Sequence, residues 1–145
     1  MNTWIPVICT ERLRCNMVDK ELLSRKISNL QSYVSGLAAA DDINWDTYLN
    51  DVRSRAFVER YLHLAIEEVI DIANHLVSFC AFREPTGYRD LFSVLHEQGV
   101  IPENQLMTFQ DMASFRNMLV HRYEKIDDAV VFGFFKKRLS DFLLF

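Results

Sequence analysis

Apolar residues recur at intervals of four and three along much of this chain, and that spacing limits the folds it can adopt. The clearest example runs through the segment 20–37, where the apolar residues are Leu23, Ile27, Leu30, Val34 and Leu37. Such intervals place side chains along one narrow face of an α-helix. The 145 residues include only 4 Gly and 3 Pro, which leaves little material for the turns of a β fold. The sequence therefore predicts an all-α fold, an antiparallel helical bundle.

The rest of the chain predicts enough further segments for a bundle of about five helices. One long stretch spans Asp46 to Phe82, which a break near Val52 can interrupt, with Asp46 as its N-terminal cap. Shorter helices are expected at 88–98, closed by a left-handed Gly99, and at 102–121, begun by Pro102. Asp127 or Asp128 caps a last helix. The expected inward residues are Phe57, Tyr61, Leu64, Ile72, Leu76, Phe79, Leu91, Phe92, Leu95, Leu106, Phe109, Ala113, Val120, Val131, Phe135, Phe142 and Phe145.

Composition and charge exclude several classes of protein. A hydrophobic content of 50% in 145 residues suits one domain with a substantial core. A net charge of -4 argues against a protein that coats nucleic acid through a broad basic surface, so any RNA contact must be local. No apolar run approaches membrane-spanning length, and nothing resembles a secretory leader. Cys9, Cys15 and Cys80 are then most simply free thiols in a reducing cytoplasm.

One stretch, from Ser114 to Glu124, offers the chemistry of an active site. It places Arg116, His121 and Tyr123 at offsets of zero, five and seven residues. A guanidinium holds phosphate oxygens in a bidentate fork, and an imidazole moves protons near neutral pH. A single helix would display these groups without closing them into a pocket. The stretch therefore points to RNA or a nucleotide as the ligand.

These residues resemble the Arg-x4-His-x-Tyr signature of the HepT-like branch of the HEPN ribonuclease toxins. The segments 59–76, 88–102 and 115–123 resemble the family's second, third and fourth helices. In all, the resemblance covers about residues 17–145. The short motif alone is weak evidence, but the motif in register with three flanking segments is specific.

The resemblance implies a toxin of a type VII-like toxin–antitoxin system that cleaves mRNA or tRNA without a metal or other cofactor. A symmetric homodimer would bring two copies of the motif together, so that Arg116 and His121 of both chains form the catalytic site. The implied partner is an MntA-like minimal nucleotidyltransferase antitoxin that transfers AMP to Tyr123. The cleaved RNA would carry a 2',3'-cyclic phosphate.

Other residues have both a supporting and a structural interpretation. Asn117 can position a water or a phosphate, or bond to the backbone. Asp71 can orient Arg116 or His121 as a supporting residue. Glu67, Asp71 and His75 share one helix stripe, but dinuclear sites in helix bundles draw ligands from several helices, so we expect no metal. In the structural interpretation, Arg116 pairs with Glu67 or Asp71, His121 caps a helix, and Tyr123 is a surface aromatic. His63 and His96 are assigned no role.

Two alternatives to a nuclease toxin follow from the same residues. The chain can be a non-catalytic helical partner and modification substrate of a nucleotidyltransferase, or a structural dimerisation domain that gives the three motif residues no purpose. The domain is expected at 17–145. Residues 1–16 are expected to be an N-terminal extension, either a disordered tail or the product of a misread start.

Overall fold

The computed structural model describes residues 20–121 and 126–144, and these residues form six α-helices and one 3-10 helix. The helices are α2 (Lys20–Ala39), α3 (Trp45–Asn50), α4 (Val52–Phe79), α5 (Tyr88–Glu97), α6 (Glu103–Val120), α7 (Asp128–Lys137) and η2 (Leu139–Leu144). The predicted all-α fold is confirmed. None of the described helices is long and apolar enough to cross a membrane.

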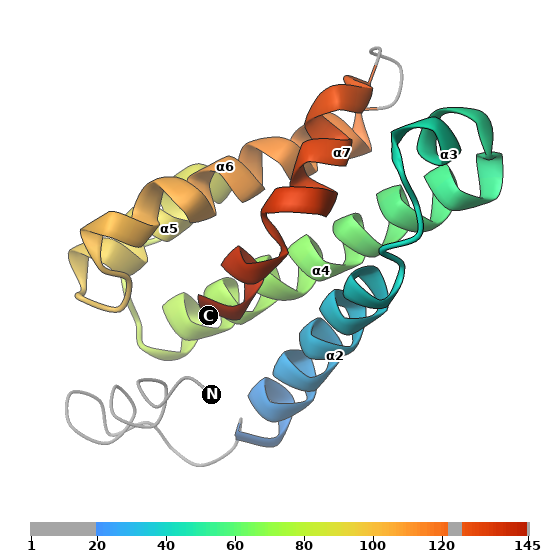
Figure 1. The fold of residues 1–145 in the computed structure, drawn as a ribbon. Helices are drawn as coiled ribbons and strands as arrows, with labels where there is room; N and C mark the ends of the chain where they lie inside the picture. Colours follow the sequence, from blue (N-terminus) through green and yellow to red (C-terminus); the bar gives the residue numbers. More distant parts are fainter. Residues whose placement is uncertain (1–19, 122–125, 145) are drawn as a thin grey trace.

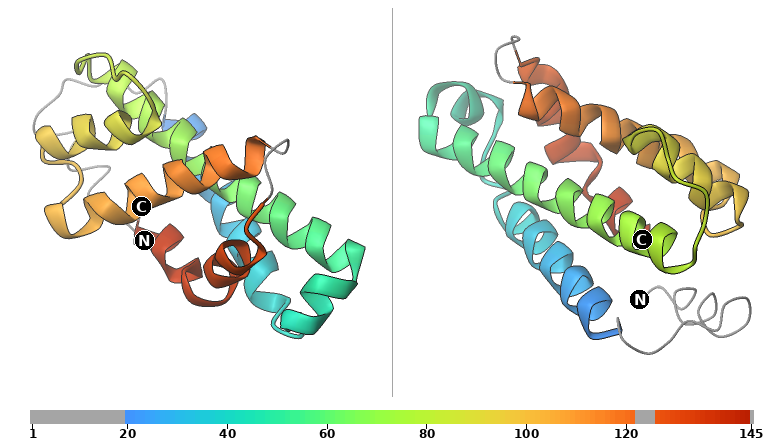
Figure 2. Two further views of the ribbon diagram at one scale, coloured as in Figure 1. Left: turned by 90° about the horizontal axis from the view of Figure 1, so that it is seen from above. Right: turned by 180° about the vertical axis from the view of Figure 1, so that it is seen from behind.

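The 28-residue helix α4 is the centre of the fold. It contacts each of the other described helices. Helix α2 lies along one side of α4 and the α5–α6 pair along the other, and the views from the front and from behind agree on this (Figures 1 and 2). Both α2 and α6 run antiparallel to α4 (Figure 1). Two helices on opposite sides of α4 can therefore each contact it without touching one another.

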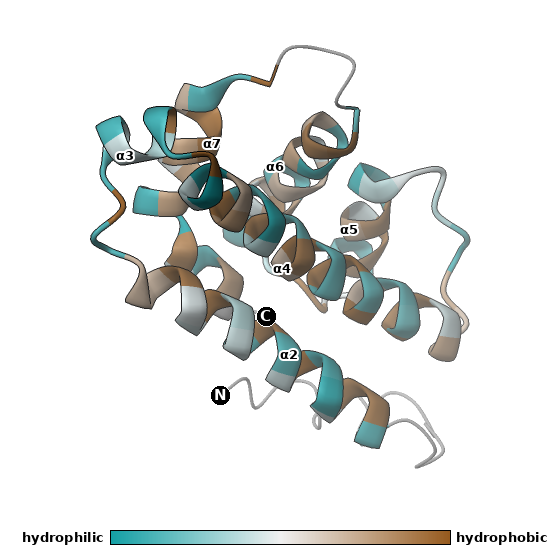
Figure 3. Cartoon of the chain, turned by 90° about the vertical axis from the view of Figure 1, so that its right-hand side faces the viewer, coloured by the Kyte–Doolittle hydropathy of each residue, from teal (hydrophilic) through white to brown (hydrophobic). Residues whose placement is uncertain are grey.

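The helices bury one face each, as their apolar spacing predicts. The ribbons of α2 and α4 alternate between hydrophilic and hydrophobic segments (Figure 3). Leu23, Leu30, Val34 and Leu37 are buried as expected, while Ile27 is partly buried against them. Val120 is the exception, because 40% of its surface is exposed although the spacing placed it inside. It is the last residue of α6, and its neighbour Leu119 faces the core instead, with 5% of its surface exposed.

The long helical stretch expected from Asp46 to Phe82 is two helices divided at Asp51, which confirms the predicted break near Val52, and the second helix ends at Phe79. The Asp51 side chain accepts hydrogen bonds from the backbone N–H of Arg53 at 3.2 Å and the hydroxyl of Ser54 at 2.6 Å, and so begins α4. The cap of α3 is Asn44, whose side chain accepts from the N–H of Thr47 at 2.8 Å. The prediction of Asp46 as the cap was wrong by two residues, because Asp46 already lies inside the helix. Both asparagine and aspartate are favoured caps, so composition alone does not choose between them.

The connections around α5 follow the predicted turns. Gly99 has a φ of 75°, the left-handed conformation expected after the helix. Pro102 precedes the first helical residue as the N-cap instead of occupying that first position. Leu91, Phe92 and Leu95 are buried as predicted. This hairpin packs α6 against α5.

Helix α7 is fixed at the end that follows the motif. Asp127 caps it by accepting from the N–H of Ala129 at 3.0 Å, which confirms one of the two predicted caps. Asp128 binds Arg55 of α4 at 3.1 Å. Both groups adjoin the buried Tyr48, whose phenol pKa is raised by burial and by the charge of Glu59. The start of α7 is therefore held in place by the Asp127 cap and by the ion pair between Asp128 and Arg55.

Some predictions concern residues that the structure does not describe, and the remaining predicted core positions can be compared with it. Residues 1–16, Tyr123 and Phe145 lie outside the described residues. The inward positions predicted for Ile72, Phe109, Ala113, Val131 and Phe142 are confirmed, as are those of Leu76 and Phe135. Phe57, Tyr61 and Leu106 are partly buried against the core, and Leu64 and Phe79 are also half-buried.

Candidate active site

The rotation of α6 about its own axis is fixed by aromatic packing on two neighbours. Phe109 stacks on Phe92 of α5 with ring centroids 5.4 Å apart. Phe115 stacks on Phe134 of α7 at 4.1 Å. Aromatic pairs prefer particular ring arrangements, and these add stability to that gained from burying the ring surface. The residue after Phe115, Arg116, is therefore directed toward α4 and α5.

Arg116 is held by one contact from each of these two helices. Its Nε donates to Oε1 of Glu67 on α4 at 2.7 Å. Its guanidinium carbon lies 4.8 Å from the ring centroid of Tyr88 on α5, within cation–π distance. The side chain keeps 20% of its surface exposed. The guanidinium is thus anchored at its inner nitrogen and along one face.

A second arginine in the same chain shows what a purely structural guanidinium looks like. Arg83 uses all three nitrogens: Nε and Nη2 bind Glu97 at 3.0 and 2.8 Å, and Nη1 and Nη2 both bind Asp90 at 2.8 Å. These bonds hold the pKa of Asp90 well below its usual range and raise that of Arg83. Within the described residues, Arg116 makes a hydrogen bond through Nε alone. Its terminal Nη1 and Nη2 are left as a fork of the kind that binds phosphate oxygens.

His121 and Asn117 lie at the C-terminal end of α6, where both side chains are exposed. His121 is the C-cap, with φ −82° and ψ 64°, and its backbone N–H donates to the carbonyl of Asn117 at 3.1 Å. Five helical residues separate two positions by about 7.5 Å along the axis and about 140° around it. The imidazole of His121 and the guanidinium of Arg116 therefore leave α6 in different directions. Tyr123 lies outside the described residues.

The carboxylate that Arg116 binds is Glu67, and the supporting role of Asp71 toward Arg116 or His121 stays a prediction. Asp71 lies one helical turn further along α4 and binds Lys26 of α2 at 2.8 Å. Lys26 also approaches Glu68, at 3.5 Å. One turn along α4 is enough to direct a carboxylate toward α2 instead of α6. The structural interpretation of Arg116 did name Glu67 as a possible partner.

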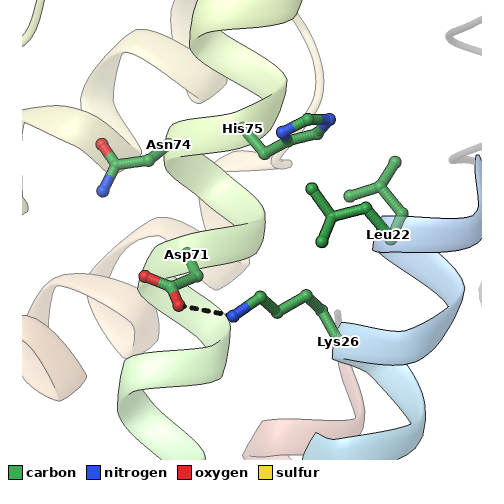
Figure 4. Close-up of a pocket in the computed structure, with 6 residues that line it drawn as sticks. Leu22, Lys26, Asp71, Asn74 and His75 are labelled. Carbon is green, nitrogen blue, oxygen red and sulfur yellow. Dashed lines mark hydrogen bonds and ion pairs between the residues drawn. The ribbon is translucent and has the colours of Figure 1, made fainter. Parts of the chain in front are cut away.

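A pocket of about 340 Å³ adjoins this Lys26–Asp71 pair. It lies between α2 and α4, as the close-up shows (Figure 4). Its lining residues are Leu22, Leu23, Lys26, Asp71, Asn74 and His75. Neither Arg116 nor His121 lines it. The Arg116 guanidinium lies elsewhere, against Glu67 of α4 and Tyr88 of α5.

Three further residues lie around the Arg116–Glu67 pair: Arg60 and Tyr88, which the sequence analysis did not single out, and His63, to which it assigned no role. His63 Nε2 lies 3.1 Å from the same Glu67 oxygen that Arg116 binds. Arg60 Nη1 lies 3.4 Å from His63 Nδ1, and Tyr88 lies against the guanidinium. Residues 60, 63 and 67 are spaced three and four apart, the spacing of neighbours on one helix face. That spacing was visible in the sequence, but nothing there showed that α6 would dock on this face.

Comparisons with known proteins identify the family of this chain. Residues 23–145 match the model of the family described as HepT-like, Ribonuclease HepT-like. A tRNA nuclease HepT from Aphanizomenon flos-aquae is 24% identical over 115 residues, covering 79% of this chain and 78% of that protein. An mRNA nuclease HepT from Shewanella oneidensis is 30% identical over 81 residues, covering 56% of this chain and 61% of that protein.

A solved structure with the same fold is the tri-AMPylated HEPN toxin of Shewanella oneidensis in complex with MNT antitoxin. It superposes with a TM-score of 0.78 at 22% identity, and the match covers 86% of this chain and 93% of that one. At this identity the likeness concerns the fold. The match to the family model spans most of the chain. The chain therefore belongs to the ribonuclease HepT-like family.

Proposed function

We propose that this chain is a metal-independent endoribonuclease and the toxin of a toxin–antitoxin pair, with Arg116 and His121 as its catalytic residues. The observation that carries the proposal is the anchoring of Arg116. Glu67 and Tyr88 fix its Nε and one face, while Nη1 and Nη2 make no hydrogen bond within the described residues. A guanidinium held in this way is prepared for a phosphate, whereas the saturated Arg83 is not. The names of the two HepT relatives, a tRNA nuclease and an mRNA nuclease, support RNA as the substrate.

The reaction divides between a base, an acid and a cation. A neutral imidazole takes the proton of the RNA 2'-hydroxyl, and that oxygen forms a bond to the adjacent phosphorus. The bond from phosphorus to the 5'-oxygen breaks, and an imidazolium gives the departing oxygen a proton. The products are a 2',3'-cyclic phosphate and a free 5'-hydroxyl. Arg116 stabilises the charge that develops on the phosphate oxygens.

Two imidazoles are needed, and one chain supplies a single motif histidine. We therefore propose a symmetric homodimer in which the ends of two α6 helices meet. A twofold axis places the same patch of both chains together, so that each provides a His121 and an Arg116. The exposure of His121 and Asn117 at the end of α6 favours this arrangement. Asn117 would then position a water or a phosphate oxygen.

The first test is cleavage of RNA by the purified chain, expressed without a partner and kept free of divalent ions with EDTA. We expect cleavage to continue in EDTA, because no step in the reaction uses a metal. We expect the new 3' ends to resist ligation to a 5'-phosphate until the cyclic phosphate is opened and the remaining phosphate is removed, which leaves a 3'-hydroxyl. Cleavage that stops in EDTA and returns with magnesium would overturn the mechanism.

We further propose that AMP transfer to Tyr123 silences the nuclease, and that the donor enzyme is a minimal nucleotidyltransferase. The phenol oxygen attacks the α-phosphorus of ATP, the α–β phosphoanhydride bond breaks, pyrophosphate departs and the phenol proton is lost. The AMPylated state of the Shewanella toxin, bound to MNT antitoxin, supports this. Tyr123 is two residues from His121, so an attached nucleotide would place its own phosphate where the RNA phosphate must bind. Such a pair would act in the cytoplasm, where its RNA and ATP are found.

Tyr123→Phe separates the two activities. The variant should cleave RNA at close to the wild-type rate, because the phenol hydroxyl has no part in the reaction above. It should gain no mass when incubated with ATP and the nucleotidyltransferase from the same organism, whereas wild type gains AMP and loses activity. Intact-mass spectrometry measures the first result and RNA cleavage the second. AMP addition to the variant at the wild-type level would show that another residue is modified.

The second candidate function is that of a non-catalytic partner and modification substrate of the nucleotidyltransferase. The complexes of relatives with antitoxins favour it to the same degree. It predicts that the unmodified chain leaves RNA intact under every condition. It also predicts that expression of the chain in cells leaves growth unchanged, both as wild type and as His121→Ala.

A further inference from the structure

A second arginine, Arg60 of α4, is linked to Arg116 of α6 through two intervening residues of α4. The guanidinium of Arg60 is exposed, and its Nη1 lies 3.4 Å from His63 Nδ1. A guanidinium only donates hydrogen bonds, so Nδ1 is the acceptor and His63 carries its proton on Nε2. That Nε2–H then donates to Oε1 of Glu67 at 3.1 Å, the oxygen that Arg116 also binds. One continuous set of contacts therefore links Arg60 to Arg116.

The charges along this set do not cancel. Arg116 and Glu67 neutralise one another, and His63 in this tautomer is neutral, so Arg60 leaves the group with one net positive charge. Four of the other cations in the described fold, Lys26, Arg55, Arg83 and Arg138, lie within 4 Å of a carboxylate, whereas some exposed ones, such as Arg25, do not. Arg60 has no carboxylate within that distance among the described residues. In a chain with net charge -4, this is a local site for a polyanion.

The positions also suit a strand that passes both arginines. Residues 60 and 67 are separated by roughly 10 Å along α4 and lie nearly on one line of the helix. The flexible Arg60 side chain can cover part of that distance. When one RNA phosphate is bound at Arg116, the Arg60 guanidinium can therefore reach the next phosphate of the strand or the one after it. His63 holds Arg60 from one side and leaves the rest of its fork open. We propose that Arg60 forms a second phosphate subsite for single-stranded RNA, positioned by His63; this rests on the ribonuclease function proposed above.

The test measures RNA binding in a parent that cannot cleave, the full chain with His121→Ala. The probe is a short fluorescein-labelled polyuridine RNA, and its Kd is measured by anisotropy at several salt concentrations. Adding Arg60→Gln should weaken binding roughly tenfold at low salt, as expected for one charge-assisted contact. It should also reduce the slope of log Kd against log salt by about 0.7, the loss of one phosphate contact on a single strand. Arg60→Lys should keep that slope, because it keeps the charge.

The matched control is Arg25→Gln in the same parent. Arg25 is an exposed arginine of α2, and α2 lies on the opposite side of α4 from α6 (Figure 2). Arg25→Gln and Arg60→Gln each remove one positive charge, so the nonspecific electrostatic attraction of the chain for RNA changes equally in the two variants. If Arg60→Gln and Arg25→Gln have the same slope and affinity, Arg60 is no subsite. A change in oligomeric state of Arg60→Gln, seen by light scattering, would also overturn the proposal and make Arg60 an interface residue.

The possible outcomes distinguish failure of the Arg60 subsite from failure of the ribonuclease function on which it rests. If wild type cleaves RNA and the parent binds it, but Arg60→Gln behaves as the control, only the subsite is wrong. If wild type leaves RNA intact and the parent fails to bind the probe, the ribonuclease function and the subsite are both wrong.

Discussion

Replacing His121 with Ala is expected to lower the rate of RNA cleavage by at least about 10⁴-fold. In the proposed dimer this change removes both the base and the acid, and each such group contributes roughly 10²- to 10⁴-fold. The fold should not suffer, because the side chain is exposed and the cap of α6 uses the backbone N–H of residue 121, which alanine retains. Single-turnover cleavage of labelled RNA measures the rate, and circular dichroism checks the fold.

Val120→Ala is the matched control for this variant. Val120 precedes His121 at the same exposed end of α6, with 40% of its surface exposed. Truncating it changes the same region without touching the imidazole, so the rate should stay near that of wild type. If Val120→Ala loses activity as His121→Ala does, the end of α6 has only a structural role. Full activity of His121→Ala would remove His121 from the catalytic pair.

Mixing wild type with His121→Ala tests the dimer itself. If one site needs both imidazoles, a mixed dimer is inactive, and activity falls with the square of the wild-type fraction once subunits have exchanged. If each chain works alone, activity falls in proportion to that fraction. A linear titration would therefore leave the nuclease in place and overturn the shared site.

The sequence predicted the helices well because apolar spacing is a local property. The apolar face of α2 from Leu23 to Leu37 depends only on residues nearby in the chain, and so do the helix caps at Gly99 and Asp127. The boundary errors have equally local causes. Asn44 and Asp46 are both good caps, and the choice between them depends on where the turn places its first N–H group.

The candidate site was predictable only in part, because it depends on how helices dock. Arg116 and His121 could be identified from their spacing, but the partner of Arg116 could not. Glu67 and Asp71 are one turn apart on α4, and periodicity treats them alike. The structure separates them, since α6 approaches Glu67 while α2 approaches Asp71. His63 and Tyr88 were missed for the same reason, because their relevance follows from the docking of α5 and α6 on α4.

Arg116→Lys should lower the cleavage rate by about 10²- to 10³-fold, the usual cost of removing one oxyanion donor. Lysine keeps the charge but has one nitrogen, which cannot bind Glu67 and present a fork to phosphate at once. The loss should therefore fall on kcat, while KM changes little because the charge that attracts RNA remains. Steady-state kinetics of the full chain with a short RNA measures both constants.

Glu67→Gln tests whether the anchor matters through geometry or through charge. The amide oxygen can still accept from Arg116 Nε, so orientation is partly kept and the rate should fall only about tenfold, equivalent to about 1.4 kcal/mol. Glu67→Ala removes the anchor and should approach the loss of Arg116→Lys. In the double variant Arg116→Lys with Glu67→Ala, the losses should not add, because the glutamate acts through the arginine. Additive losses would show that Glu67 has a separate role.

Arg83→Lys distinguishes positioning from simple stability. Arg83 binds Asp90 and Glu97 of α5 with all three of its nitrogens, so its loss weakens the connection between α4 and α5 without touching Arg116. We expect a lower melting temperature and an unchanged cleavage rate, the reverse of the pattern for Arg116→Lys. If both arginine variants lower the melting temperature and leave kcat intact, the Arg116–Glu67 pair is structural, and the catalytic cation must be sought elsewhere in the chain.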